Sequence, residues 1–326
     1  MERILQIENL STSFKTERGI VKAIEGVSFD VYKGEILGIV GESGCGKSVT
    51  SQSVMRLYDE KYQVQYTGKI LFNGRNILSL SEKEMQNVRG NDIAMVFQDA
   101  LSALNPVFTV GHQIMDTLKI HQGMKKAEAR EKAVEMLRLV GIPDPEKRVD
   151  QYPHELSGGM RQRVMIAIAL CCQPMLLIAD EPTTALDVTI QAQIMDLILD
   201  LNKKLDMGVM LITHDLSVVA EVCSRVAVMY LGQIVEEAEV NTIFDHPLHP
   251  YTAGLMKSVP KMEGERDERL YQIKGMVPML NQIPKGCRFS PRCPYATEKC
   301  HKEMPEQRRV SETQSVRCFY AGEIDY

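Results

Sequence analysis

Lys47 and Ser48 end a glycine-rich stretch, GESGCGKS (residues 41–48), that follows the short apolar run at residues 36–40. In the pattern G-x-x-x-x-G-K-[ST], backbone N–H groups wrap a phosphate, the lysine reaches the outer phosphates and the hydroxyl binds Mg²⁺. A strand, a turn and a helix opening near Gly46 would position these groups. The candidate phosphate-binding residues are Gly41, Ser43, Gly44, Cys45, Gly46, Lys47, Ser48 and Val49. Cys45 is interpreted either as a reactive thiol or as a tolerated variable position.

Two adjacent carboxylates, Asp180 and Glu181, follow the apolar run MLLIA at residues 175–179. Open α/β sheets bind ligands at the carboxyl ends of their buried strands, so we expect this pair beside the phosphate loop. Asp180 would hold Mg²⁺ through water, and Glu181 would orient and deprotonate the attacking water. His214 ends a third apolar run, GVMLIT, and is similarly placed to bond the terminal phosphate.

These residues alone fit many P-loop NTPases, including small-molecule kinases. The stretch LSGGM at residues 156–160 opens a strongly apolar helix, with Ser157 as a good N-cap and Gly158 and Gly159 allowing close backbone approach. It is a second phosphate-binding helix start, which one nucleotide does not need within a single chain. Two copies facing each other would use it, one chain closing over the nucleotide of the other.

Four cysteines crowd a tail rich in proline and charge: Cys287, Cys293, Cys300 and Cys318. Their spacing, C-x₅-C-x₆-C-x₁₇-C, lacks the C-x₂-C pairs common in zinc sites and the C-x₂-C-x₂-C run of bacterial ferredoxins. Four thiolates still satisfy Zn²⁺ or a [4Fe–4S] cluster, and free thiols or disulfides remain open. The tail has too little apolar sequence for a good core of its own, so we expect it to be stabilised by something other than a core, such as a bound metal, a cluster or disulfides.

The elements that position these residues follow from the rest of the chain. Residues 1–90 mix strand-type runs with the first helix, and residues 100–160 carry helical periodicity, as in AEAREKAVEMLRLVGI. The fold class is therefore α/β with a helical insert. The 326 residues, 44% hydrophobic and 25% charged, suit an ordinary globular protein. A formal net charge of −5 argues mildly against a nucleic-acid-binding chain. Because the first residues lack a signal-peptide layout and no apolar run approaches about 18 residues, we expect a cytoplasmic location.

Together these motifs, in their order and spacing, resemble the ATP-binding cassette (ABC) transporter ATPases over roughly residues 1–239. The resemblance implies a P-loop NTPase core of ABC type, with an antiparallel β subdomain, a signature-bearing helical subdomain at about 100–165, and a nucleotide sandwich dimer. By matching position, Phe14 would stack on adenine, Gln98 would sense Mg²⁺ and the membrane partner, and Asp187 would communicate between the two sites. Phe14, where tyrosine is common, and Met160, where glutamine is usual, depart from the pattern without removing a phosphate ligand.

Within that family, the stretches QDALSALNPVFTVGHQI, YPHELSGGMRQRVMIAIAL, HPLHPYTAGLMKSVP and GCRFSPRCPYATEKC resemble the D-type ATPase of dipeptide and oligopeptide importers. This implies a nonidentical second ATPase, two membrane subunits and an external solute-binding protein, with a homodimer available in isolation. The chain would lie at the cytoplasmic face of the membrane. The resemblance also implies that the four tail cysteines hold a [4Fe–4S] cluster. The cassette would occupy residues 1–240 and a cysteine-rich extension residues 241–326.

Two alternatives stay open. The same ATPase can serve another solute, such as nickel, because the substrate is chosen elsewhere in the complex. A soluble ABC protein of translation or DNA repair is the other; such proteins usually carry two cassettes or a long coiled-coil insertion, and this chain has one cassette and no heptad run.

Overall fold

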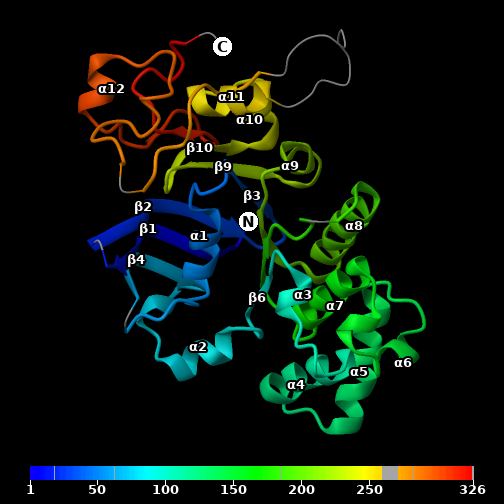
Figure 1. Cartoon of the computed structure of the whole chain (residues 1–326). Coiled ribbons are helices and arrows are strands. Elements are labelled where there is room, and N and C mark those ends of the chain that lie inside the picture. Colours follow the sequence, from blue (N-terminus) through cyan, green and yellow to red (C-terminus); the bar gives the residue numbers. More distant parts are fainter. Residues whose placement is uncertain (18, 62, 185, 259–270, 281, 325–326) are drawn as a thin grey trace. The chain divides into compact units, whose positions relative to one another are not determined.

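The structure, a computed structural model, describes residues 1–17, 19–61, 63–184, 186–258, 271–280 and 282–324 (Figure 1). The chain divides into two compact units. The first unit consists of Met1–Ile4, Val31–Ile36 and Ser79–Ile212, and the second of Leu5–Asp30, Leu37–Leu78 and Thr213–Tyr326.

Three parallel strands form the sheet of the first unit: β6 (Ile93–Val96), β7 (Leu176–Asp180) and β8 (Gly208–Ile212). Every residue of these strands is buried, as expected for apolar runs covered on both faces. Asp180 pairs with Ile212, so the strands end at one edge. Residues that follow β6 and β7 are therefore delivered to the same edge.

Helices make up the rest of the first unit. The 3₁₀ turn η1 (Ile77–Ser79) leads into it, and η2 (Pro153–Glu155) precedes the signature helix, the helix that the LSGGM stretch at residues 156–160 opens. Helices α4 and α5 pack against each other through small and apolar side chains, including Ile114 on α4 and Ala133 on α5. The helices are α2 (Glu82–Val88), α3 (Ala100–Ala103), α4 (Val110–Gln122), α5 (Lys126–Leu139), α6 (Pro145–Arg148), α7 (Gly158–Leu170) and α8 (Val188–Leu205).

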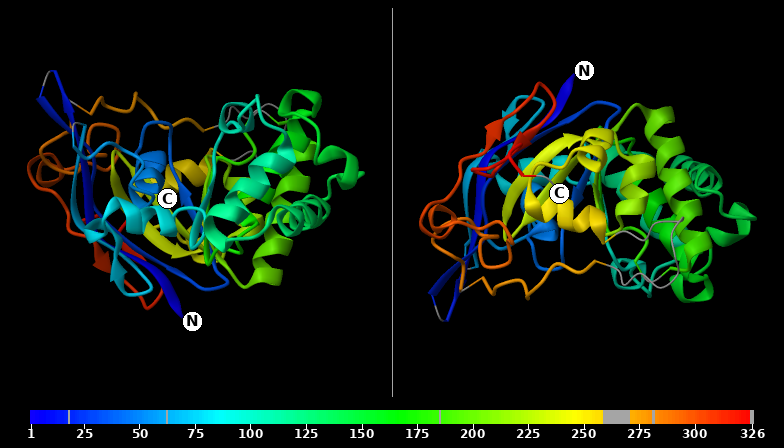
Figure 2. Two further views of the ribbon diagram at one scale, coloured as in Figure 1. Left: turned by 90° about the horizontal axis from the view of Figure 1, so that it is seen from below. Right: turned by 90° about the horizontal axis from the view of Figure 1, so that it is seen from above.

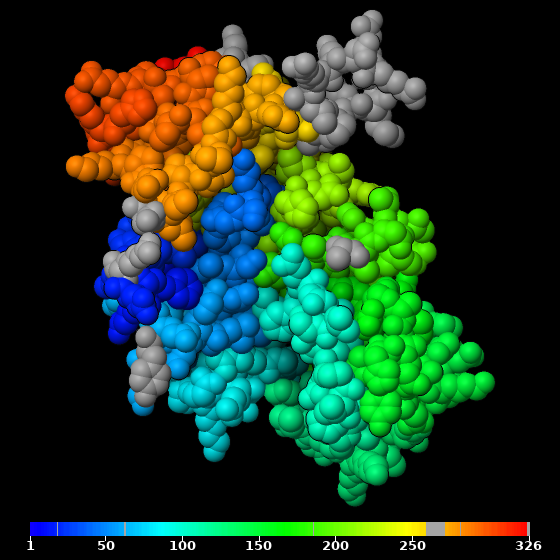
Figure 3. All heavy atoms as spheres, viewed as in Figure 1, coloured from blue at the N-terminus to red at the C-terminus, as the bar shows by residue number. Residues whose placement is uncertain are grey.

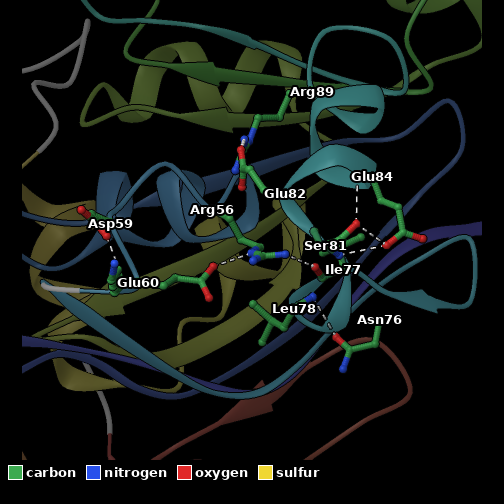
Figure 4. Close-up of polar contacts among 11 residues, drawn as sticks. Arg56, Asp59, Glu60, Asn76, Ile77, Leu78, Ser81, Glu82, Glu84 and Arg89 are labelled. Atoms are coloured by element: carbon green, nitrogen blue, oxygen red, sulfur yellow. Dashed lines mark hydrogen bonds and ion pairs between the residues drawn. The ribbon is translucent and has the colours of Figure 1, made fainter.

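Local caps set the ends of short elements, as Figure 4 shows for two of them. In the first unit, Ser81 and Glu84 form a capping box that opens α2, with the Glu84 carboxylate accepting from the Ser81 N–H at 2.9 Å. In the second unit, Arg56 follows α1, pairs with Glu60 and donates to the Ile77 carbonyl at 3.0 Å. The capping box satisfies backbone N–H groups that the start of α2 leaves open. The Arg56 bond instead ties the chain after α1 to the start of η1.

Two sheets form the second unit. One is antiparallel, in the order β2 (Gly19–Tyr32), β1 (Arg3–Thr16), β4 (Val64–Phe72) and β5 (Arg75–Asn76). In the other, β3 (Ile36–Val40) pairs in parallel with β9 (Arg225–Tyr230), and β10 (Gln233–Glu239) follows antiparallel to β9. The second unit thus contains both the predicted antiparallel sheet and β3, the strand before the glycine-rich loop.

The C-terminal residues join the second sheet rather than forming a core of their own. Strand β12 (Ser315–Val316) pairs with β10, and β11 (Arg308–Arg309) pairs with β12; Figure 2 shows them in red. The helices of this unit are α1 (Lys47–Val54), α9 (Leu216–Val222), α10 (Val240–Asp245), α11 (Pro250–Lys257) and α12 (Glu298–Lys302).

Gly111, in the first turn of α4, packs directly on the chain at Val149. A Cβ at this position would lie 2.2 Å from Val149 Cγ2 and 2.6 Å from its carbonyl oxygen. We therefore expect Gly111→Ala to lower the free energy of unfolding by about 1–3 kcal/mol, measured by urea denaturation. Gln122→Ala, at the exposed end of the same helix, is the control and should change it by less than about 0.5 kcal/mol. Equal stabilities of the two variants would contradict the close packing.

Candidate nucleotide site and cysteine pocket

The phosphate loop of the second unit leaves β3 and enters α1 at Lys47, as the sequence predicted. Gly41 has a φ of 151°, and a Cβ there would lie 2.2 Å from the Met229 carbonyl oxygen on β9. Gly44 and Gly46 also have positive φ, at 78° and 105°. The loop therefore needs glycine at these turns, which leaves backbone N–H groups free of side chains where a phosphate would bind.

Lys47 is only 5% exposed and its ammonium donates to the carbonyls of Gly41 and Glu42, at 2.8 and 3.2 Å. These bonds fold the side chain back over the loop. Lys47, held over the glycine turn at the start of an eight-residue helix, would supply the positive charge that phosphates require.

Cys45 is buried within this loop, 1% exposed. Burial raises the pKa of the Cys45 thiol, although Lys47 nearby opposes the shift. A thiol with a raised pKa is a poor nucleophile, so the structure favours a packing role over the reactive alternative. Cys171, Cys172 and Cys223 are buried as well, as expected of small apolar side chains.

Two further predicted residues lie in the second unit. Phe14, on β1, is half-buried and meets the Tyr58 ring edge-on, with centroids 4.8 Å apart. His214 is exposed and follows Thr213, whose N–H donates to the Ile39 carbonyl near the end of β3. The histidine thus lies close to the strand end from which the phosphate loop begins.

In the first unit, the structure brings Gln98 and Glu181 together. The Gln98 amide donates to the Glu181 carboxylate at 3.1 Å, and the Thr184 hydroxyl donates to the same oxygen at 2.9 Å. Glu181 has a φ of 47°, and its N–H bonds to the Ile212 carbonyl on the neighbouring strand. Asp180, only 4% exposed, ends β7 just before it. The carboxylate of Glu181 is therefore held by two side chains at the strand edge.

The signature helix α7 begins as predicted, with the Ser157 hydroxyl accepting from the Met160 N–H at 3.3 Å. Gly159 faces the start of α8, where a Cβ would lie 2.9 Å from Ile190 Cγ2. A Cβ at Gly158 would lie 3.8 Å from Leu186 Cδ2, an ordinary contact. Asp187 caps α8 by accepting from the Ile190 N–H at 3.0 Å. Ser157, Gly158 and Asp187 are exposed, so both helix starts face outward from this unit.

The four tail cysteines come together at one pocket in the second unit. Cys287, Cys293, Cys300 and Cys318 all line it, with Phe289 and Tyr320 among its walls, and its empty volume is about 340 Å³ counted to the open mouth. The Cys287 N–H donates to the Cys300 carbonyl at 2.7 Å. All eight cysteines are free thiols, so the disulfide alternative is not realised.

Burial raises the thiol pKa values in this pocket, to about 11 for Cys287 and about 12 for Cys293, and it raises the pKa of Cys318 as well. Repulsion between neighbouring thiolates adds to the shift. Among the described residues, however, no group of three or more His, Cys, Asp or Glu side chains is arranged to hold a metal ion. The structure therefore brings the predicted ligands together and gives no support for a preformed metal centre.

Comparison with known proteins decides the family. An ABC transporter model matches residues 24–184, and the model described as oligopeptide/dipeptide transporter, C-terminal region, matches residues 235–300. The oligopeptide transport ATP-binding protein OppD of Bacillus subtilis is 55% identical over 97% of this chain and 88% of its own length. The dipeptide transport ATP-binding protein DppD of Escherichia coli is 48% identical over 97% of this chain and 96% of its own length.

This chain belongs to the ABC transporter ATPases. The resemblance predicted from the motifs is thereby confirmed, and the protein is an ATPase of this family. The solved dimeric bacterial ABC transporter cassette MJ0796 has the same fold, with a TM-score of 0.64 and 28% identity over 73% of this chain and 99% of its own. No helix within the described ranges has the length and apolarity needed to cross a membrane.

Two residues that support the carboxylate edge of this ABC ATPase were missed in the sequence. Thr184 bonds Glu181, and Gln162 of α7, 3% exposed, donates to the Pro182 carbonyl at 2.5 Å. Each lies three residues from a predicted one, Thr184 from Glu181 and Gln162 from Gly159. A polar residue facing the apolar side of α7 was the available signal for Gln162.

Glu181→Gln tests the role of the carboxylate. Glutamine keeps the size and hydrogen bonds of the side chain but cannot take a proton, so we expect kcat for ATP hydrolysis to fall on the order of 10²–10⁴-fold while ATP binding persists. Phosphate release and binding of a fluorescent ATP analogue measure the two. Glu131→Gln, an exposed carboxylate on α5, should leave both unchanged. Undiminished hydrolysis in the Glu181 variant would rule out a general base at this position.

Proposed function

We propose that this ABC ATPase is the ATP-hydrolysing subunit of an importer for dipeptides or oligopeptides. The match of residues 235–300 to the C-terminal region of oligopeptide and dipeptide transporters carries the proposal, because the ATPase motifs alone are shared by importers of many solutes. The relatives named for dipeptide and oligopeptide transport extend over the full chain and support it.

The hydrolytic roles follow from the site residues. The phosphate loop and Lys47 would bind the β- and γ-phosphates, with Ser48, Gln98 and Asp180 holding Mg²⁺, which neutralises developing charge when bound. Glu181 would take the proton of the attacking water, and its bond from Gln98 supports that orientation. His214 would hydrogen-bond the γ-phosphate, and Phe14 would stack on adenine.

Dimer formation would complete the site. The helix start at Ser157, Gly158 and Gly159 would close over the nucleotide of a second ATPase, and Asp187 would communicate between the two sites. We infer a heterodimer with a nonidentical ATPase, with homodimers forming when this chain is isolated. The heterodimer would bind two membrane permease subunits, to which an external solute-binding protein delivers the solute. Such an assembly would place this chain at the cytoplasmic face of the membrane, with no role for nucleic acid.

The extension after the cassette would carry a cofactor. We propose a cassette at residues 1–240, with its helical subdomain at about 100–165, and an extension at 241–326 in which Cys287, Cys293, Cys300 and Cys318 bind a [4Fe–4S] cluster. Their convergence on one pocket supports this. A cluster spreads its thiolates over four iron atoms, so its ligands lie farther apart than those of one Zn²⁺. Loading would displace protons from these high-pKa thiols.

Reconstitution tests the transport proposal. The protein is coexpressed with the membrane proteins that copurify with it, placed in proteoliposomes with the external binding protein, and assayed for uptake of a radiolabelled dipeptide and a tetrapeptide. We expect ATP-dependent peptide uptake, which the complex carrying Glu181→Gln should lose. ATP-dependent uptake of nickel without peptide would favour an importer of another solute, and the absence of any membrane partner would favour a soluble ABC protein. Either result would contradict peptide import.

Anaerobic purification tests the cofactor. We expect a brown protein with about four iron and four sulfide per chain, and loss of both in Cys300→Ser. Cys223→Ser, which removes a buried thiol outside the pocket, is the control and should keep the colour. One zinc per chain, or no metal, would overturn the cluster while leaving the ATPase activity assigned to other residues.

A further inference from the structure

The segment between the first two pocket cysteines lies directly on the phosphate loop. Arg292, whose side chain is 4% exposed, forms a two-pronged ion pair with Glu42: its Nη1 lies 2.6 Å from Oε2 and its Nη2 lies 3.0 Å from Oε1. Glu42 is the second residue of the loop GESGCGKS. In Figure 3 the orange atoms of this part of the chain lie next to the blue atoms of the N-terminal segment.

The guanidinium of Arg292 is fixed on its other sides. Its Nε donates to the Lys274 carbonyl at 3.2 Å, and its Nη2 also reaches the Ile273 carbonyl at 3.4 Å. The Tyr230 ring lies beneath it, with the guanidinium carbon 5.8 Å from the ring centroid. A planar fork held in this way can orient a carboxylate in one geometry, which a lysine cannot do.

A second contact from the same C-terminal elements reaches Glu42 through its backbone. The Glu42 N–H donates to the Tyr251 hydroxyl at 2.9 Å. The Tyr251 ring packs against Phe289, 2% exposed, with centroids 5.4 Å apart. Both the side chain and the backbone of Glu42 are therefore held by residues that follow the cassette core.

The turn that carries Arg292 and Phe289 is built between two pocket cysteines. The Phe289 carbonyl accepts from the N–H groups of Arg292 and Cys293, at 2.9 and 3.0 Å, and the Cys287 carbonyl accepts from Ser290 at 2.9 Å. Because the turn is this tight, a displacement of Cys287 or Cys293 would be transmitted to Arg292.

We propose that Arg292 is a positioning residue for the phosphate loop, and that the turn at residues 287–293 couples the cysteine pocket to nucleotide binding. The inference rests on the ATPase function of the loop and deepens it with a regulatory contact. Glu42 is the residue through which the turn acts on the loop. When the turn is in place, Tyr251 and Arg292 hold the backbone and carboxylate of Glu42, and the backbone N–H groups after Glu42 then face the phosphates. Because coupling between two sites is reciprocal, nucleotide at the loop would in turn stabilise the pocket.

Nucleotide affinity tests the positioning role. We expect Arg292→Gln to raise the Kd for ATP, and the KM in steady state, on the order of tenfold, with a smaller change in kcat, since the catalytic carboxylate is untouched. Arg292→Lys should fall between this variant and the wild type, because it keeps the charge and loses the fork. The double variant Arg292→Gln/Glu42→Gln should bind ATP no more weakly than the single variants do, because both changes remove the same ion pair.

Two further variants keep the test interpretable. Arg130→Gln removes an equally two-pronged but exposed pair with Asp150 and should leave ATP affinity unchanged. Tyr251→Phe removes the acceptor of the Glu42 N–H while keeping the ring, and should also raise the Kd for ATP. It replaces Arg292→Gln as the test if that variant does not fold. Wild-type affinity in a folded Arg292→Gln protein, or in Tyr251→Phe where that variant stands in, would overturn the inference.

Thiol labelling tests the coupling without measuring activity. A maleimide is added, with and without ATP, to full-length protein from which any bound metal has been removed, and mass spectrometry of peptides follows Cys287, Cys293 and Cys318 separately from Cys45. We expect ATP to slow labelling of the pocket cysteines several-fold in the wild type and to have no effect in Arg292→Gln. A rate that ignores ATP in the wild type, or responds equally in the variant, would refute the coupling. A wild type that binds no ATP would instead refute the proposed function.

Discussion

The conformation of the phosphate loop depends on one steric constraint, the absence of room for a side chain at Gly41. The Met229 carbonyl occupies the position that a Cβ would take. That close approach is set by parallel pairing of β3 with β9, in which Val40 faces Val228. After the loop leaves β3, Lys47 folds back over it and α1 begins, with its first N–H groups where the proposed phosphate would bind. Arg292 and Tyr251 then contact, at Glu42, a loop whose first residue is already fixed.

The arrangement of Gln98 and Glu181, in the first unit, depends on strand register instead. Parallel strands ending in register bring Gln98, after β6, to Glu181, after β7. A half-buried carboxylate held by Gln98 and Thr184 has few orientations left, which would lower the entropic cost of aligning a water molecule in the proposed reaction. Gln162 ties the signature helix to the segment just after this glutamate. The helix that would meet a second subunit is thus tied by a hydrogen bond to the segment that follows Glu181, the proposed general base.

Polar contacts, together with a buried aromatic cluster of Tyr230, Tyr251 and Phe289, hold the C-terminal residues to the rest of the second unit. Glu236 on β10, fully buried, accepts from the backbone N–H groups of Leu248 and His249 and from the Gln314 amide. Arg288, 3% exposed, reaches the Leu231 carbonyl and Glu25. Each buried polar group is costly unless it is paired, so these bonds specify one arrangement of a segment with little apolar surface. The same arrangement places the turn between Cys287 and Cys293 against the loop.

The sequence by itself determined the ABC family, the phosphate loop, the carboxylate edge and the signature helix, because each is a contiguous motif whose glycine, lysine or carboxylate has only a local requirement. It also predicted that the tail cysteines act together. It did not indicate Thr184 or Gln162 as supports of the carboxylate edge, nor the pairing of Arg292 with Glu42, which are 250 residues apart. An ion pair between distant residues leaves no periodic or local trace in a chain. Only the tertiary structure, through strand order and the folding of the C-terminal residues onto β9 and β10, decided which charges meet.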